Sequence, residues 1–146
     1  MNDPQPLLLQ EVERVAYQLA KDNLTWNEPF PAFTTRLPNI LESCLLTPFA
    51  GTADKEFYPL LLDKASILFY LMIKNHPFQN GNKRMAVTTL FLFLHKNGFW
   101  IEIPPSVLYK LAVKVASSES KEKDIILIFI KSIIEVFLSS AKVLNS

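Results

Sequence analysis

The segment His76-Pro77-Phe78-Gln79-Asn80-Gly81-Asn82-Lys83-Arg84 is a short polar stretch between two long apolar ones, residues 59–75 and 85–94. Proline disfavours helical backbone angles at the residue before it, so Pro77 predicts that the first apolar stretch is a helix ending near Asn75. The second apolar stretch is long enough to form another helix. We therefore expect a buried helical hairpin whose connecting loop is more polar than a simple turn requires.

The second half of this segment places cations where helices usually carry acidic residues. Asn82 suits the N-cap of the second helix, which puts Lys83 and Arg84 in its first turn. Unpaired N–H groups make that turn partially positive, so two cations are disfavoured there unless an anion binds beside them. Gly81 allows the backbone to approach such an anion closely. Together these features predict a phosphate site; the alternative for each residue taken alone is a solvated helix end.

His76 lies at the other end of the same loop, and an imidazole is a proton acceptor near neutral pH. The alternative is that the ring only caps the preceding helix. We predict a phosphate held beside a proton acceptor, with His76, Lys83 and Arg84 as the catalytic candidates.

The nine-residue segment resembles the signature of the Fic/Doc (Fido) family, which reads approximately H-x-F-x-[DE/N]-[GA]-N-[GK]-R. The residues that match it are His76, Phe78, Gly81, Asn82 and Arg84. Weaker similarity extends from about Leu37 to the C-terminal helix. The resemblance implies an all-α fold, a compact helical domain with a central buried helix and a short flap hairpin. It further implies a single domain over residues 1–146, with a core of about 37–138 on which a helix of about 6–21 packs.

The resemblance also implies an activity, the transfer of part of ATP to a Ser, Thr or Tyr hydroxyl of a target protein. His76 would take the proton of that hydroxyl. Gly81, Asn82 and the backbone N–H groups that follow would hold phosphate oxygens, while Lys83 and Arg84 would offset the charge that develops in transfer. Phe78 is expected to point into the core.

Three departures from the family pattern narrow this expectation. Asn80 stands where many members have an acid that binds Mg²⁺; its amide oxygen is a weaker ligand, so Mg²⁺ is expected mainly through the nucleotide. We keep Asn80 as a phosphate-site and metal candidate. Lys83 replaces a common glycine, and the second arginine of R-x-x-R is absent. The last two features resemble the death-on-curing (Doc-like) branch, which favours phosphoryl transfer by a toxin-type modifier. AMP transfer and a non-catalytic nucleotide-binding module are the alternatives.

Residues 47–59 are less regular and resemble the family's flap. We expect Gly51, Thr52, Ala53 and Asp54 to dock the target protein by backbone pairing; an ordinary surface loop fits the sequence equally well. Some relatives are restrained by a [ST]-x-x-x-E-[GN] helix, but Lys123 follows the partial match at 118–122, which we interpret as chance. Restraint is therefore expected from a separate antitoxin, if there is one.

Composition excludes several other classes of protein. With 49% hydrophobic residues and only three glycines, the chain has material for a helical core. A net charge of +1 gives no reason to expect nucleic acid or a membrane surface as a partner. The one cysteine, Cys44, is expected to be a small buried residue. No targeting segment or membrane span is expected, which predicts a cytoplasmic protein.

Apolar spacing predicts the remaining elements. We expect helices over residues 6–20, 39–46, 60–73, 106–116 and 120–138, and a helix that Asn82 caps and that contains the apolar stretch 85–95. Asn97-Gly98 should end this last helix, and Ser120 should cap the helix over 120–138. In the first helix the expected core face is Leu8, Leu9, Val12, Val15, Ala16 and Leu19. Trp26, Phe30 and Phe33 in the following loop are expected to be packing anchors.

Overall fold

Helices joined by short loops make up the computed structural model, which describes residues 3–23 and 30–138. Within these ranges there is no β-strand, so the all-α prediction is confirmed. In chain order the α-helices are α1 (Leu9–Glu11), α2 (Gln18–Asn23), α3 (Pro38–Leu46), α4 (Leu61–Lys74), α5 (Asn82–Lys96), α6 (Pro105–Ser117) and α7 (Lys123–Leu138). A π-helical segment, η1 (Val12–Tyr17), joins α1 to α2, and the 3₁₀ turns are η2 (Phe33–Thr35), η3 (Thr47–Phe49) and η4 (Ser120–Glu122). Trp26 lies outside the described residues.

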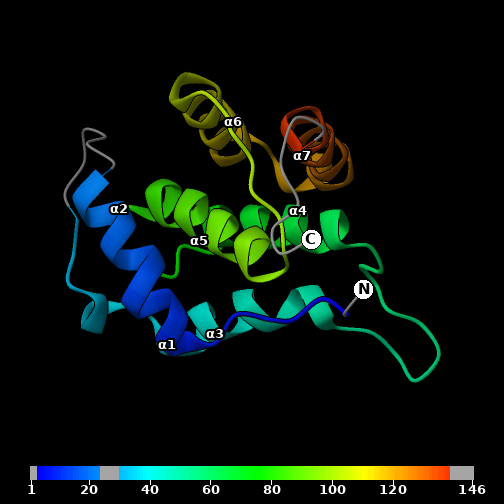
Figure 1. The fold of residues 1–146 in the computed structure, drawn as a ribbon, viewed down its shortest axis with the longest axis horizontal. Helices are drawn as coiled ribbons and strands as arrows, with labels where there is room; N and C mark the ends of the chain where they lie inside the picture. The colour runs from blue at the N-terminus through cyan, green and yellow to red at the C-terminus, as the bar shows by residue number, and fades with distance from the viewer. Residues whose placement is uncertain (1–2, 24–29, 139–146) are drawn as a thin grey trace.

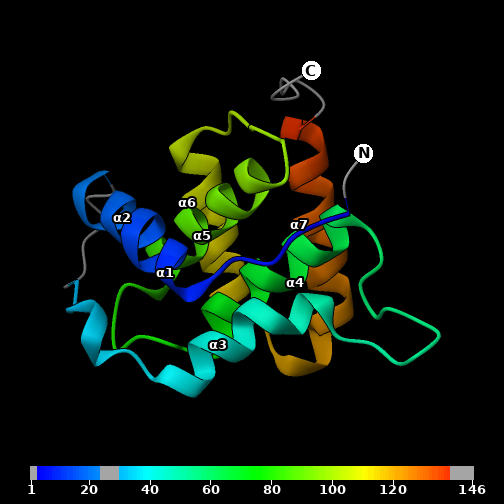
Figure 2. The same cartoon turned by 60° about the horizontal axis from the view of Figure 1, so that its bottom comes forward.

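The helical hairpin of α4 and α5 forms the centre of the molecule. Helices α6 and α7 cover one side of it and α3 lies on the other, while the N-terminal helix packs across α5 (Figures 1 and 2). Every residue of α4 from Lys64 to Ile73 is buried. The resemblance implies one central buried helix, whereas in the structure α4 and α5 together occupy the centre.

The N-terminal helix buries a different face from the one predicted. Val12 and Ala16 are fully buried as expected, but Leu8, Val15 and Leu19 are 54%, 40% and 41% exposed. For Val15 and Leu19 the cause is η1, whose wider i→i+5 turns rotate the chain relative to a regular α-helix, whereas Leu8 is the extended N-cap residue before the helix. The prediction assumed one uninterrupted 3.6-residue period, which fails at this segment.

Helix α5 begins one residue away from where the sequence predicted its cap. Gly81 is the N-cap, with a left-handed φ of 76°, and Asn82 is the first helical residue. The prediction of Asn82 as N-cap is wrong, because the glycine supplies the sharp entry into the helix and frees the Asn82 side chain for other bonds. At the other end Gly98 has φ 91°, as predicted for a left-handed cap.

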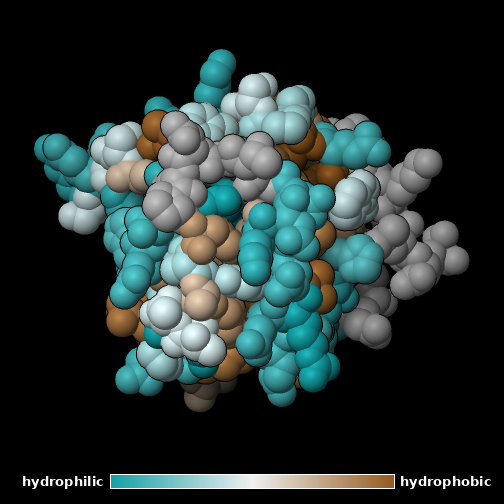
Figure 3. Space-filling view, turned by 90° about the vertical axis from the view of Figure 1, so that its left-hand side faces the viewer, coloured by the Kyte–Doolittle hydropathy of each residue, from teal (hydrophilic) through white to brown (hydrophobic). Residues whose placement is uncertain are grey.

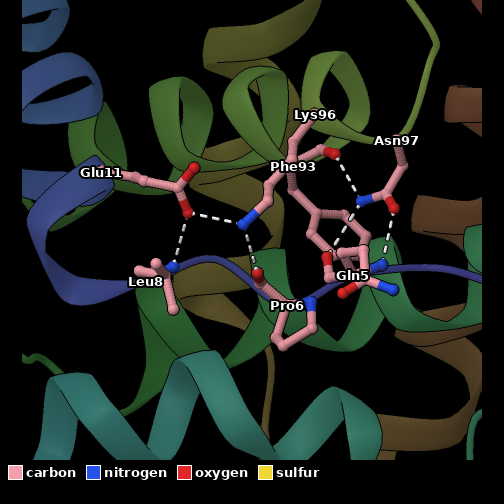
Figure 4. Close-up of polar contacts among 7 residues, drawn as sticks. All are labelled: Gln5, Pro6, Leu8, Glu11, Phe93, Lys96 and Asn97. Atoms are coloured by element: carbon pink, nitrogen blue, oxygen red, sulfur yellow. Dashed lines mark hydrogen bonds and ion pairs between the residues drawn. The ribbon is translucent and has the colours of Figure 1, made fainter.

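A carboxamide just beyond α5 holds the N-terminal segment in place. Asn97 Oδ1 accepts from Gln5 N at 2.7 Å and its Nδ2 donates to Gln5 O at 3.1 Å (Figure 4). Lys96 Nζ bonds to Pro6 O at 2.9 Å and to Glu11 Oε1 at 2.7 Å. The extended chain before α1 is thus fixed across the C-terminal end of α5.

The loop between η3 and α4 is closed by one isolated antiparallel bridge, between Gly51 and Glu56. The flap hairpin expected here is not present as a pair of strands in the described chain. Its two ends are tied to α4 by Lys64, whose buried Nζ donates to Pro48 O at 3.2 Å, to Glu56 Oε1 at 2.8 Å and to Tyr58 O.

The last helix also starts differently from the prediction. Glu119 is the N-cap of η4 and its N–H bonds to Glu122 Oε1 at 2.8 Å, so the expected Ser120 cap is wrong. The Glu122 carboxylate, three residues further along the chain, accepts from the Glu119 N–H, so the cap lies one residue before Ser120. Lys131 on α7 then pairs with Asp63 on α4 at 2.9 Å.

Candidate functional site

A small pocket of about 140 Å³ lies at the N-terminal end of α5. Its walls come from the loop between α4 and α5, from the end of α4 and from the end of α6. Figure 3 shows the side of the molecule on which this loop lies, and the surface there is mostly hydrophilic with smaller apolar patches. The lining residues are Ile73, His76, Gln79, Asn80, Gly81, Asn82, Lys83 and Ala116.

The loop enters the pocket through a strained residue. His76 has φ 48°, the left-handed region that non-glycine residues seldom adopt. Its neighbours hold it there, because Pro77 is buried and its carbonyl accepts from Leu37 N at 2.8 Å. Phe78 is 2% exposed and its ring lies 5.8 Å from that of Phe33, so its expected position in the core is confirmed.

Asn82 uses its side chain inside the loop. Its Oδ1 accepts from Phe78 N at 2.9 Å, and its Nδ2 donates to Phe78 O at 2.8 Å. The same Nδ2 lies 3.4 Å from His76 Nδ1. The asparagine thereby joins the imidazole, the apolar anchor Phe78 and the first turn of α5.

The two predicted cations have different surroundings. Lys83 is half-buried and lines the pocket. Arg84 is 4% exposed and is not among the lining residues; its guanidinium carbon lies 4.4 Å from the centre of the Phe30 ring. The ring also packs on Gly81, where an added Cβ would come within 2.7 Å of it.

The structure therefore brings together His76, Asn80, Gly81, Asn82 and Lys83 in the pocket lining, and buries Arg84 against Phe30 outside that lining. It does not bring Gly51, Thr52, Ala53 and Asp54 to the same place. Their loop precedes α4, whereas the pocket follows it, and the two lie on opposite sides of the molecule in Figures 1 and 2. At about 1.5 Å per residue, α4 separates them by roughly 20 Å.

Sequence reasoning missed three residues of the pocket wall, Ile73, Gln79 and Ala116. Gln79 lies inside the motif but was assigned no function, and Ala116 comes from a distant helix that only tertiary packing brings near. Phe30 was expected to be a packing anchor, and this is confirmed by its ring contact with Tyr17 at 5.1 Å. Its contact with Arg84 had no signal in the sequence.

The pocket has the chemistry of an anion site. The N–H of Met85 bonds back to Gly81 O at 2.9 Å, and the N–H groups before it have no carbonyl of their own helix to bond. Lys83 adds a cation and the helix dipole adds partial positive charge. Among the described residues no group of three or more His, Cys, Asp or Glu could hold a metal ion, and Asn80 offers one exposed amide.

The chain forms a helical domain with a polar pocket at the loop between α4 and α5. Comparison with known proteins gives its family. Residues 9–94 match the Fic/DOC family, more than half of the chain, and the chain belongs to that family. It is also similar to Toxin Doc of Mycolicibacterium smegmatis (strain ATCC 700084 / mc(2)155), with 37% identity over 59 residues. That alignment covers 40% of this chain and 45% of the relative, so it spans less than half the relative's length. No solved structure matches the chain. No helix in the described ranges is long and apolar enough to cross a membrane.

Proposed function

We propose that this protein is a Doc-like transferase that moves the γ-phosphoryl group of ATP to a Ser, Thr or Tyr hydroxyl of a target protein. The observation that carries the proposal is the pocket, in which His76, Lys83 and the first turn of α5 meet. A proton acceptor, a cation and free helix N–H groups are the parts that phosphoryl transfer requires.

Each part has one task in the proposed reaction. The target hydroxyl oxygen attacks the γ-phosphorus, its proton passes to His76, and the bond to the bridging oxygen breaks so that ADP leaves. Lys83 and the backbone N–H groups at Gly81 and Asn82 stabilise the charge on the phosphate oxygens. Mg²⁺ would arrive with the nucleotide, with the Asn80 amide oxygen as a candidate protein ligand, and would neutralise phosphate charge.

The size of the pocket supports a site for phosphate groups alone. Pockets for drug-sized ligands have volumes of about 300–1,000 Å³, whereas this one has about 140 Å³. We infer that the phosphate chain enters it while the nucleoside lies across the open surface outside.

Phosphoryl transfer is preferred over AMP transfer because of the residue one turn after Arg84. Val87 occupies the place of the second arginine of the R-x-x-R pattern, and it is 1% exposed within the core. A second cation for the α-phosphate is therefore missing from this turn.

A labelling experiment tests the proposal. The protein is incubated with cell extract and with ATP labelled at either the α- or the γ-phosphate. We expect a labelled protein with the γ-label alone, lost in His76→Ala and kept in the control His95→Ala, whose ring is exposed at the far end of α5. Label retained from the α-phosphate would instead mean AMP transfer.

A non-catalytic nucleotide-binding module is the second candidate, and two observations favour it. Arg84 packs under Phe30 instead of lining the pocket, and Asn80 offers no charge to a metal. ATP binding without labelled protein from either label would establish the module and exclude the transferase.

The partners in this proposal are the target protein and a separate antitoxin, and the proposed place of action is the cytoplasm, where ATP is present. Gly51–Asp54 remain a proposed docking segment for the target. Gly51 and Glu56 form a pair whose flanking bonds, Thr52 N to Lys55 O at 2.8 Å and Phe57 N to Ala50 O at 3.0 Å, leave the N–H and C=O of Gly51 pointing outward. Since α4 separates this loop from the pocket, docking there would hold the body of a target protein rather than its reacting hydroxyl.

A further inference from the structure

The orientation of the Asn82 carboxamide is determined by its contacts with Phe78. Phe78 offers one backbone donor, 2.9 Å from Oδ1, and one backbone acceptor, 2.8 Å from Nδ2. Exchanging the amide oxygen and nitrogen would place Nδ2 against the Phe78 N–H and Oδ1 against the Phe78 carbonyl, and both bonds would be lost. Only one orientation of the carboxamide therefore satisfies both bonds. The atom that lies 3.4 Å from His76 Nδ1 is therefore the amide nitrogen.

We infer that Asn82 is a positioning residue for His76 and not a phosphate ligand. An N–H directed at Nδ1 is accepted only by a lone pair, so the neutral ring carries its proton on Nε2. One proton of Asn82 Nδ2 serves Phe78 O and the other serves the ring. The side chain then has no donor left for a phosphate oxygen, which the backbone N–H groups and Lys83 must bind.

The backbone of the loop gives the same picture. His76 is the one non-glycine residue with positive φ in the described chain, and such a conformation persists only where surrounding contacts over-determine it. The bond from Leu37 N to Pro77 O and the burial of Phe78 hold the main chain. The Asn82 contact adds a restraint on the ring itself, so the imidazole is oriented before any ligand arrives.

This arrangement couples Asn82 to proton uptake, a consequence that rests on the proposed function. The neutral ring has one lone pair, on Nδ1, and Asn82 occupies it. If the target proton goes to Nδ1, or if the ring proton first leaves Nε2 for Nδ1, the contact with Asn82 breaks. Transfer therefore requires the Asn82 contact to open, after which both ring nitrogens of the imidazolium are donors.

The ring nitrogens can be observed directly by ¹⁵N NMR on the full chain, under conditions where the nitrogen shifts show neutral rings. In Asn82→Asp the carboxylate has no N–H and accepts from the ring, so we expect His76 to move its proton from Nε2 to Nδ1. His95 serves as the internal reference.

A matched control lies at the other end of the same helix. The Asn97 side chain bonds to the backbone N–H and C=O of Gln5 as that of Asn82 bonds to those of Phe78, but none of its side-chain bonds involves a histidine. Asn97→Asp should leave His76 unchanged. A His76 ring that keeps its Nε2 proton in Asn82→Asp would overturn the inference. If that variant does not fold, the unmodified chain decides: an NOE between the Asn82 amide protons and His76 Hε1 is expected, and its absence rejects the contact.

Binding of ATP separates positioning from phosphate binding. Losing a charged hydrogen bond costs about tenfold or more in affinity, so Lys83→Ala should weaken ATP binding by at least that factor. Asn82→Ala should change it by less than about threefold. An equal loss in the two variants would make Asn82 a phosphate ligand. If the unmodified chain binds no ATP, the proposed function fails while the NMR result still decides the position of Asn82.

Discussion

At the scale of single residues, Lys83 is the cation that the structure places in the pocket. It precedes Arg84 in the same turn, yet only Lys83 is among the lining residues. Adjacent positions on a helix point about 100° apart, so two neighbouring cations cannot both face one small ligand equally. The motif predicts both as phosphate ligands, and packing separates them.

Replacing Lys83 with alanine should therefore abolish most binding of ATP without unfolding the protein. A charge-assisted hydrogen bond contributes about 1.5–3 kcal/mol, so its loss should raise the dissociation constant for ATP by roughly ten- to hundredfold. Calorimetry measures this constant. Lys55→Ala, in the exposed loop before α4, is the control and should bind normally. Equal affinity of the two variants would contradict the phosphate site.

Cys44 illustrates a buried residue with a predictable chemistry. It is fully buried, and burial raises the pKa of its thiol to about 11 from an ordinary 9.0, although a hydrogen bond with Asn75 acts in the opposite direction. In the unfolded chain the thiol loses its proton near pH 9, whereas in the folded chain it keeps it to about pH 11. Rising pH therefore favours the unfolded state between these values.

We expect the free energy of unfolding to fall by up to about 3 kcal/mol between pH 9 and 11 from this group alone. Urea titrations across that range measure it. Tyr70, whose pKa burial also raises, contributes in the same direction. Cys44→Ala keeps the tyrosine and removes the thiol, so its alkaline loss of stability should be smaller; an unchanged loss would contradict the assignment.

At the scale of elements, sequence patterns predicted the position of most helices and failed on faces and caps. The apolar periods gave α3, α4 and α6 to within a residue or two, because burial on the core decides where such helices lie. The exposed Val15 and Leu19 were placed inward because η1 has no signature in a hydrophobic period. Within the site, the residues of the motif were predictable, whereas Ala116 was not, since it reaches the pocket only through the packing of α6.

Lys64 connects two elements and gives a prediction at this scale. Lys64→Met keeps the volume of the side chain but leaves Pro48 O and Tyr58 O without their donor, which should cost about 1–3 kcal/mol. Amide hydrogen exchange should become faster in residues 50–57 and stay slow in α5. Glu56→Gln keeps an oxygen acceptor for Nζ and both backbone bonds of the lysine, so amide exchange in residues 50–57 should change less than in Lys64→Met. Slow exchange of the loop in Lys64→Met would show that other contacts hold it.

At the scale of the whole molecule, polar contacts fix both ends of α5 to neighbouring segments of the chain. Asn82 and Asn97 clasp backbone at opposite ends of α5, one within the motif loop and one on the N-terminal segment. Lys96 and Glu11 extend the second clasp to the start of α1 (Figure 4). The N-terminal helix therefore depends on polar anchoring as well as on its buried face.

This anchoring should weaken in acid. Burial alone would raise the pKa of Glu11, but the bonds from Lys96 and from Leu8 N outweigh it, so the pKa is lowered from 4.5. A lowered folded-state pKa means stability that is present above about pH 4.5 and lost as the pH falls through the folded value. Between pH 6 and pH 3 the Tm of thermal unfolding should fall less for Glu11→Gln than for the unmodified chain. The exposed Glu13→Gln should behave like the unmodified chain, and identical profiles for all three would refute this account.

The wide turn of η1 makes the first helix tolerant of a missing residue. A π-helical turn holds about one residue more than an α-helical turn, so losing one position from 12–17 would let a regular α-helix form while the segments on either side keep nearly the same faces. Glu11 would therefore stay beside Lys96 at the end of α5. The same deletion inside α5, which has no wide turn to absorb it, would rotate one end of that helix relative to the other by roughly 100°.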